Sequence, residues 1–147
     1  MATYDLRRKI AEQYPYDTSI VRGGSPMVKM SKIIDAEAAT IVKGSALTTA
    51  DIAKLFDIPA YALIQAVLVN VITAEGAACT IDVGDSGSAS RYANDLDANT
   101  TGLTVYSTNY SVGATAIDFR VTFNTASTDM FKAQVTVCYL DMACTAS

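Results

Sequence analysis

The sequence predicts an all-β fold: an antiparallel β-sandwich or jelly roll, with a short helical turn near residues 49–56 and an extended N-terminal arm. Three observations support this prediction. Apolar and polar residues alternate along several segments, as they do in half-buried strands. Gly, Asn, Asp and Ser residues separate these segments and provide turns. The chain has 147 residues, of which 50% are hydrophobic and 18% charged, and this is enough apolar surface for one packed core.

The N-terminal segment differs from the rest of the chain. Leu6 and Ile10 lie four residues apart, with Tyr14 behind them, a spacing typical of a short amphipathic helix that the following proline would end. Gly and Pro residues then indicate a loose connector with little apolar content. We therefore divide the chain into an arm, residues 1–26, and a β-sandwich domain, residues 27–147.

The first part of the domain has a weaker pattern. Residues 27–42 are compatible with two short strands, although the alanine-rich residues 36–39 could equally be helical. Residues 48–51, Thr-Thr-Ala-Asp, resemble a helix-capping box with Asp in place of Glu. Apolar residues follow at helical spacing as far as Pro59, so the helical turn is expected over 49–56.

Beyond this turn the chain is expected to be all β. Residues 64–72 are apolar on both faces, which is typical of a strand enclosed between two layers. A turn at 73–76 follows, after which three apolar residues alternate with polar ones. These three residues, Cys79, Ile81 and Val83, are expected to face the core.

The last third of the chain contains the clearest strands. Residues 85–102 are expected to form a long polar loop, and residues 103–106 a short strand. Apolar and polar residues then alternate without interruption over 117–123. After a turn, the same period returns over 131–139 and predicts the last strand.

Composition excludes several classes of function. The chain contains no histidine, so it cannot build a Ser-His-Asp triad, a Cys-His pair or a histidine-ligated metal site. The net charge is −4, and residues 55–147 hold only Arg91, Arg120 and Lys132 as basic residues. Without a basic cluster, nucleic-acid binding is not expected. The longest apolar stretch, 58–74, is interrupted by polar residues and rich in β-branched ones, so no membrane helix is expected.

The cysteines indicate a reducing compartment. Cys79, Cys138 and Cys144 are an odd number, and their spacing matches neither a disulfide framework nor a CxxC metal site. The N-terminus also lacks the apolar stretch of a signal peptide. Both observations favour synthesis in the cytoplasm.

Four aspartates are the candidates for acid–base chemistry or metal binding: Asp82, Asp85, Asp95 and Asp97. Aspartate in polar turns is more often explained by hydrogen bonds to the turn backbone, and we favour that interpretation. A loose calcium site stays open as the alternative. The neighbouring Ser86 has no base to activate it. We therefore predict no catalytic residue, no cofactor and no dedicated metal site.

The tyrosines allow two interpretations. Tyr61, Tyr92, Tyr106 and Tyr110 could form a sugar-binding face, since aromatic rings stack on sugars. Half-buried strand and loop residues, or subunit contacts, explain the same residues, and this second interpretation is favoured.

Residues 47–87 carry a resemblance to a known family. This segment reads LTTADIAKLFDIPAYALIQAVLVNVITAEGAACTIDVGDSG. It resembles small β-sandwich proteins of tailed bacteriophages that decorate or cement the capsid. Residues 91–98 also look like the loop that follows Gly-Asp in those proteins, so the resemblance covers about the middle third of the chain.

The resemblance implies a virion structural protein without enzyme activity, made in the cytoplasm of the bacterial host. Such proteins lie on the outer capsid surface, commonly as trimers, and bind across neighbouring subunits of the major capsid protein. The alternatives are a phage head-fibre or tail component, or a carbohydrate-binding module. On the favoured interpretation the arm contacts capsid protein or an adjacent copy. Its expected apolar anchors are Leu6, Ile10, Tyr14 and Tyr16, and its expected basic contacts are Arg7, Arg8 and Lys9.

Overall fold

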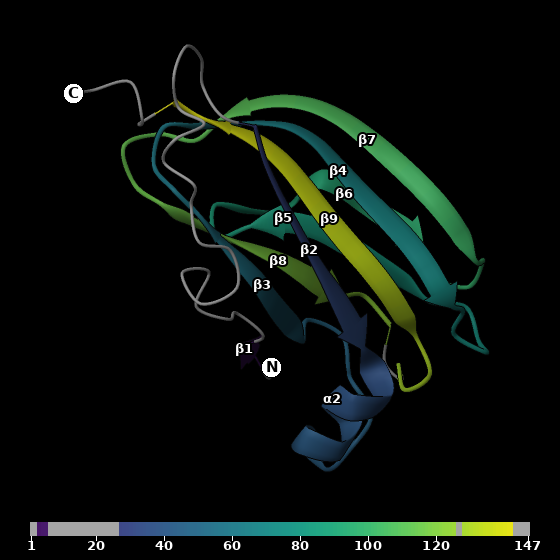
Figure 1. The fold of residues 1–147 in the computed structure, drawn as a ribbon. Coiled ribbons are helices and arrows are strands. Elements are labelled where there is room, and N and C mark those ends of the chain that lie inside the picture. Colours follow the sequence, from purple (N-terminus) through teal and green to yellow (C-terminus); the bar gives the residue numbers. More distant parts are fainter. Residues whose placement is uncertain (1–2, 6–26, 126–127, 143–147) are drawn as a thin grey trace.

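The computed structural model describes residues 3–5, 27–125 and 128–142, and within these ranges the chain forms nine strands and one helix. The strands lie in two sheets that pack face to face, with the helix at one end of the sandwich (Figure 1). Strand β1 pairs parallel to β3, and all the other strand pairs of the described residues are antiparallel. The predicted antiparallel β-sandwich is therefore confirmed.

Strand order identifies the jelly-roll arrangement. One sheet has the order β2-β9-β4-β7, and the other has the order β1-β3-β8-β5-β6. Most successive strands from β2 to β9 cross from one sheet to the other, as they do in an eight-stranded jelly roll. The strands of the four-stranded sheet are β2 (Met27–Asp35), β9 (Lys132–Asp141), β4 (Ala62–Thr73) and β7 (Gly102–Ser111). Those of the five-stranded sheet are β1 (Thr3–Asp5), β3 (Ile52–Ile58), β8 (Ile117–Phe123), β5 (Thr80–Asp85) and β6 (Ser88–Asp97).

The hydrophobic core lies between the two sheets. Every second residue is buried there from Phe119 to Phe123 and from Ala133 to Tyr139, which confirms the strands predicted over 117–123 and 131–139. The largest buried side chains of these two strands are Phe119, Phe123 and Tyr139. The three residues expected to face the core before and along β5, namely Cys79, Ile81 and Val83, are also buried.

Strand β4 confirms the apolar strand predicted over 64–72, but it is not enclosed between two layers as expected. Ile64, Val67 and Val69 are fully buried between the sheets. Leu68, on the opposite face, is only half-buried, and Ile72 is 47% exposed. The described residues therefore cover one face of β4, not both.

The single helix of the described residues, α2 (Ala36–Lys43), occupies the segment for which the sequence left strand and helix open. Asp35 caps its first turn by accepting a hydrogen bond from the backbone N–H of Ala38 at 3.1 Å, and Gly44, with a φ of 80°, ends it. Lys132 lies 2.8 Å from the Asp35 carboxylate. None of the described residues forms a helix long and apolar enough to cross a membrane.

The helical turn predicted over 49–56 is wrong, because this segment is the strand β3. Asp51 does accept a hydrogen bond from the Thr48 N–H at 2.8 Å, as a capping box would, but Ala50 has a φ of 71° and the chain turns into a strand. The pairing of β3 with β8 shifts register between Lys54 and Phe56. This β-bulge buries two adjacent apolar residues, Leu55 and Phe56, and so imitates helical spacing.

The long polar loop predicted over 85–102 is also wrong, because most of it is the strand β6. Its pairing with β5 shifts register twice, so buried and exposed residues do not alternate regularly. Only Tyr92, Ala93 and Leu96 are buried in a strand otherwise rich in Ser, Asn and Asp. The short strand expected at 103–106 is part of the longer β7.

Candidate interaction surfaces

The residues predicted to contact the capsid lie outside the described residues. These are Leu6, Arg7, Arg8, Lys9, Ile10, Tyr14 and Tyr16. The start of the same arm is described, and there β1 adds to the edge of the five-stranded sheet beside β3. The contact role of the arm stays a prediction.

The four candidate aspartates do not meet in one site. Asp82 accepts hydrogen bonds from the Asp95 N–H and the Asn124 amide, both at 2.8 Å. Asp97 accepts from the Asn99 N–H at 2.8 Å, and this bond contributes most to lowering the pKa of Asp97. Among the described residues, no three Cys, Asp or Glu side chains are grouped to hold a metal ion. The favoured interpretation, hydrogen bonding to the backbone, describes Asp97 well.

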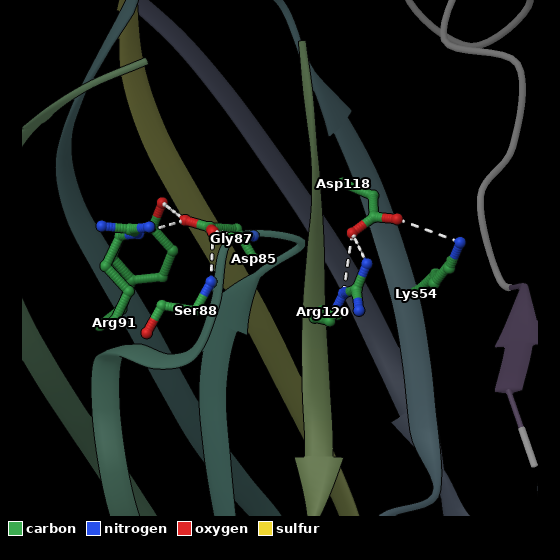
Figure 2. A network of polar contacts seen from close by, with 8 residues as sticks. Lys54, Asp85, Gly87, Ser88, Arg91, Asp118 and Arg120 are labelled. Carbon is green, nitrogen blue, oxygen red and sulfur yellow. Dashed lines mark hydrogen bonds and ion pairs between the residues drawn. The ribbon is translucent and has the colours of Figure 1, made fainter. Parts of the chain in front are cut away.

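Asp85 has a different and wholly internal role. Its buried carboxylate accepts hydrogen bonds from the backbone N–H groups of Gly87 at 2.8 Å and Ser88 at 3.0 Å, which closes the turn between β5 and β6. The Arg91 guanidinium donates to the same carboxylate at 2.6 Å (Figure 2). The Tyr92 hydroxyl also donates a hydrogen bond to the Asp85 carboxylate, at 2.8 Å. All of these contacts hold the hairpin in shape.

Aromatic contacts extend this cluster across the sandwich. The Tyr92 ring stacks on Phe119 of β8 at 5.2 Å, and Arg91 lies 4.1 Å above the ring of Tyr110 on β7. Burial, followed by the bond to Asp85, raises the pKa of Tyr92. Because Tyr92 is buried in the core, it is not available to a sugar together with the exposed Tyr61. Tyr92, Tyr106 and Tyr110 lie in strands, whereas Tyr61 lies in the turn before β4.

A second polar network lies on the outer face of the five-stranded sheet. Lys54 on β3 lies 3.1 Å from Asp118 on β8, and Arg120 donates to the same carboxylate at 2.8 Å (Figure 2). Burial alone would raise the pKa of Asp118, but the hydrogen bonds from Arg120 and Lys54 outweigh it and lower this pKa. The network joins the two neighbouring strands β3 and β8.

The outer face of the four-stranded sheet, by contrast, exposes apolar side chains near β7. Leu103 is 60% exposed and Val105 is 54% exposed. On β4, Leu68 lies opposite Val105, and Ile72, near the end of the strand, is 47% exposed. We call these four residues the β7 patch. Sequence reasoning missed it, because alternation identifies a strand but not which of its faces another layer covers.

Comparisons with known proteins find chains of similar fold in phage capsids. Scans against protein-family models and curated proteins give no match. Among solved structures, a chain of the Cyanophage Pam1 capsid asymmetric unit is 20% identical, with a TM-score of 0.59 and coverage of 80% of this chain and 84% of that one. The fold is one found in phage capsids.

Two further capsid structures contain similar chains. One is the acid-stable capsid of Helicobacter pylori bacteriophage KHP30, at 14% identity and a TM-score of 0.60, covering 80% of this chain and 89% of the other. The other is the capsid of Ralstonia phage GP4, at 14% identity and a TM-score of 0.59, covering 82% and 88%. At these identities the similarity establishes the fold.

Proposed function

We propose that this chain is a virion structural protein that decorates and stabilises the capsid of a tailed phage. In this role it sits on the outer capsid surface and binds across neighbouring subunits of the major capsid protein. The observation that carries the proposal is the fold similarity to chains from three phage capsid structures, each spanning at least 80% of this chain.

The polar side chains support a structural role. The carboxylates of Asp85, Asp118 and Asp51 are held in ion pairs within the domain, with Arg91, Arg120 and Lys43 respectively. A protein that only binds needs such internal pairs to fix its surface, and it needs no reactive group. Many copies that each bury a modest area would strengthen the shell by multivalency.

The copy number in purified virus particles tests the proposal directly. Quantitative mass spectrometry of the phage that encodes this chain should give one copy per major capsid subunit, or a fixed simple fraction of that number. A few copies per particle would instead indicate a head-fibre or tail component. Absence from particles would overturn the proposal.

We also propose that the arm makes the capsid contact and that three copies group around a threefold position. Apolar arm residues would pack on capsid protein, while the basic run Arg7-Arg8-Lys9 would face acidic capsid surface. Deleting residues 1–26 should preserve the domain and abolish binding to capsids that lack this protein.

The deletion needs a second variant, because it also removes β1 from the edge of the sheet. The double substitution Leu6→Asp/Ile10→Asp leaves β1 in place and should weaken capsid binding at least tenfold. Lys29→Gln, on the exposed face of β2, is the matched control and should bind normally. Full binding by the truncated chain would show that the arm does not make the capsid contact. The mass of the protein in solution tests separately whether it forms trimers.

A further inference from the structure

Strand β7 is an unusually open edge. In the described part of the chain it pairs with β4 alone, so half of its backbone N–H and C=O groups face away from the sheet. Proteins normally protect such edges with charged residues, prolines, bulges or short strands, because an open edge can pair with another chain. β7 has ten residues, without a proline or a charged residue. Its register shift lies between Tyr110 and Ser107, so residues 102–107 form a regular edge.

The other sheet edges are protected. β2 carries Lys29, Lys32 and Asp35, and β6 carries Arg91 along with two aspartates. β1 is only three residues long. Among the sheet edges of the described residues, β7 is the one that lacks this protection, so this edge fits a role in pairing.

We propose that the β7 edges of two copies of this chain pair antiparallel about a twofold axis and form one continuous sheet. This inference goes beyond the proposed function, because it assigns a contact between copies in addition to the contact with the capsid. Each copy carries a net charge of −4, so two copies repel. The uncharged β7 is the edge where they approach without placing like charges opposite each other.

The sequence of β7 is complementary to itself. With the axis at Thr104, this residue faces Thr104 of the other copy, and Leu103 faces Val105 of the other copy. Such Thr–Thr and aliphatic pairs are favourable cross-strand neighbours. In the same register Gly102 faces Tyr106 of the other copy, and an aromatic side chain opposite an edge glycine compensates for its missing side chain.

Pairing would also cover the β7 patch. Leu103 and Val105 project from the outer face of the sheet and are more than half exposed. Leu68 continues this apolar surface on β4, directly opposite Val105. The two patches would meet across the axis and remove one another from water. If the chain forms trimers, this contact joins copies from adjacent trimers, since a twofold contact is distinct from a threefold one.

Disulfide trapping tests the register. In a Cys138→Ser/Cys144→Ser background, Thr104→Cys places two thiols opposite each other across the axis. Mild oxidation should convert most of this variant to a covalent dimer on a non-reducing denaturing gel. Asn109→Cys is the matched control, because it lies on the same strand outside the regular segment, and it should stay largely monomeric on the gel. Equal dimer from both variants, or dimer from neither, would overturn the proposal.

The native mass tests the contact without a cross-link. Val105→Lys places a charge next to the axis, opposite Leu103 of the other copy, and light scattering should give at most half the mass of the unsubstituted protein. Ile41→Lys, on α2 and even more exposed to solvent than Val105, should leave the mass unchanged. Far-UV circular dichroism confirms that both variants fold. An unchanged mass for Val105→Lys would overturn twofold pairing. Binding of the same variant to capsids tests the proposed function separately.

Discussion

Gly84 shows how closely the chain packs at the level of a single residue. A Cβ added at this position would lie 2.1 Å from the carbonyl oxygen of Ser88 and 2.3 Å from the backbone of Ala89. Both are backbone atoms of the β5–β6 hairpin, and they cannot move without opening it. Glycine is therefore required here for close approach of two backbone segments.

We expect Gly84→Ala to reduce the free energy of unfolding by more than about 2 kcal/mol, because the hairpin must shift to admit the methyl group. Gly113→Ala is the control, since a Cβ there meets nothing within 4 Å. Urea denaturation monitored by circular dichroism measures both variants. Equal stabilities would show that the hairpin is less tightly packed than the structure indicates.

Glu75 joins distant backbone segments. One oxygen of its buried carboxylate accepts hydrogen bonds from three consecutive backbone N–H groups, those of Asp129, Met130 and Phe131, at 3.0–3.2 Å. These bonds hold the segment that leads into β9. Removing the acceptor would deprive three N–H groups of this partner, including that of the buried Phe131.

Glu75→Ala should therefore lower the free energy of unfolding by about 2–3 kcal/mol. Glu75→Gln keeps a carbonyl oxygen at the same place and should lower the free energy of unfolding by less than Glu75→Ala does. Thermal unfolding of the two variants beside the unsubstituted protein measures the difference. If Gln and Ala were equally destabilising, charge rather than the acceptor geometry would dominate.

Only some of the side-chain hydrogen bonds could be predicted from the sequence. Sequence reasoning placed Asp97 in a hydrogen-bonded turn, because that bond is local, to the Asn99 N–H two residues on. It had no access to the partners of Glu75, which lie more than 50 residues away along the chain. Contacts between distant segments follow from the topology of the sandwich, and that topology is not a local property of the sequence.

At the scale of elements, regular alternation decided which strands could be predicted. β8 and β9 bury every second side chain, and both were predicted. β3 was mistaken for a helical turn because its bulge at Leu55 breaks the period. β6 was mistaken for a loop because its two register shifts and polar residues remove the period altogether. The β7 patch could not be predicted, since it depends on what covers the sheet.

The network that joins β3 to β8 predicts a dependence of stability on pH. The pKa of Asp118 lies below its ordinary value of 3.8 in the folded protein. The stabilisation is therefore complete above that ordinary value and is lost as the pH falls through the lower, folded-state value. The ionised carboxylate is what Lys54 and Arg120 bind.

Asp118→Asn should reduce the free energy of unfolding by about 1.5–3 kcal/mol at pH 7, the range expected for hydrogen bonds to a charged group. The difference from the unsubstituted protein should shrink as the pH is lowered below 3.8. Urea unfolding at a series of pH values measures it. A difference that stays constant with pH would show that the charge of Asp118 contributes nothing.

At the scale of the whole molecule, charge is distributed unevenly along the chain. Residues 1–54 carry eight basic and six acidic side chains, whereas residues 55–147 carry three and nine. Four of those eight basic side chains belong to the jelly roll, so residues 27–147 carry seven basic and twelve acidic side chains, whereas residues 1–26 carry four and three. An acidic body alone would be repelled by an acidic capsid surface, so the proposed docking requires the basic run of the arm to make the electrostatic contact.

This requirement predicts how docking responds to salt. Raising ionic strength from about 0.1 M to about 1 M shortens the screening length from about 10 Å to about 3 Å, so binding to capsids should weaken. The triple variant Arg7→Gln/Arg8→Gln/Lys9→Gln should bind less tightly at low salt and lose most of this dependence. Lys29→Gln keeps the run intact and should retain the full dependence. Titrations on capsids at several salt concentrations give the slopes, and equal slopes for all three proteins would place the contact on the uncharged surfaces of the domain instead.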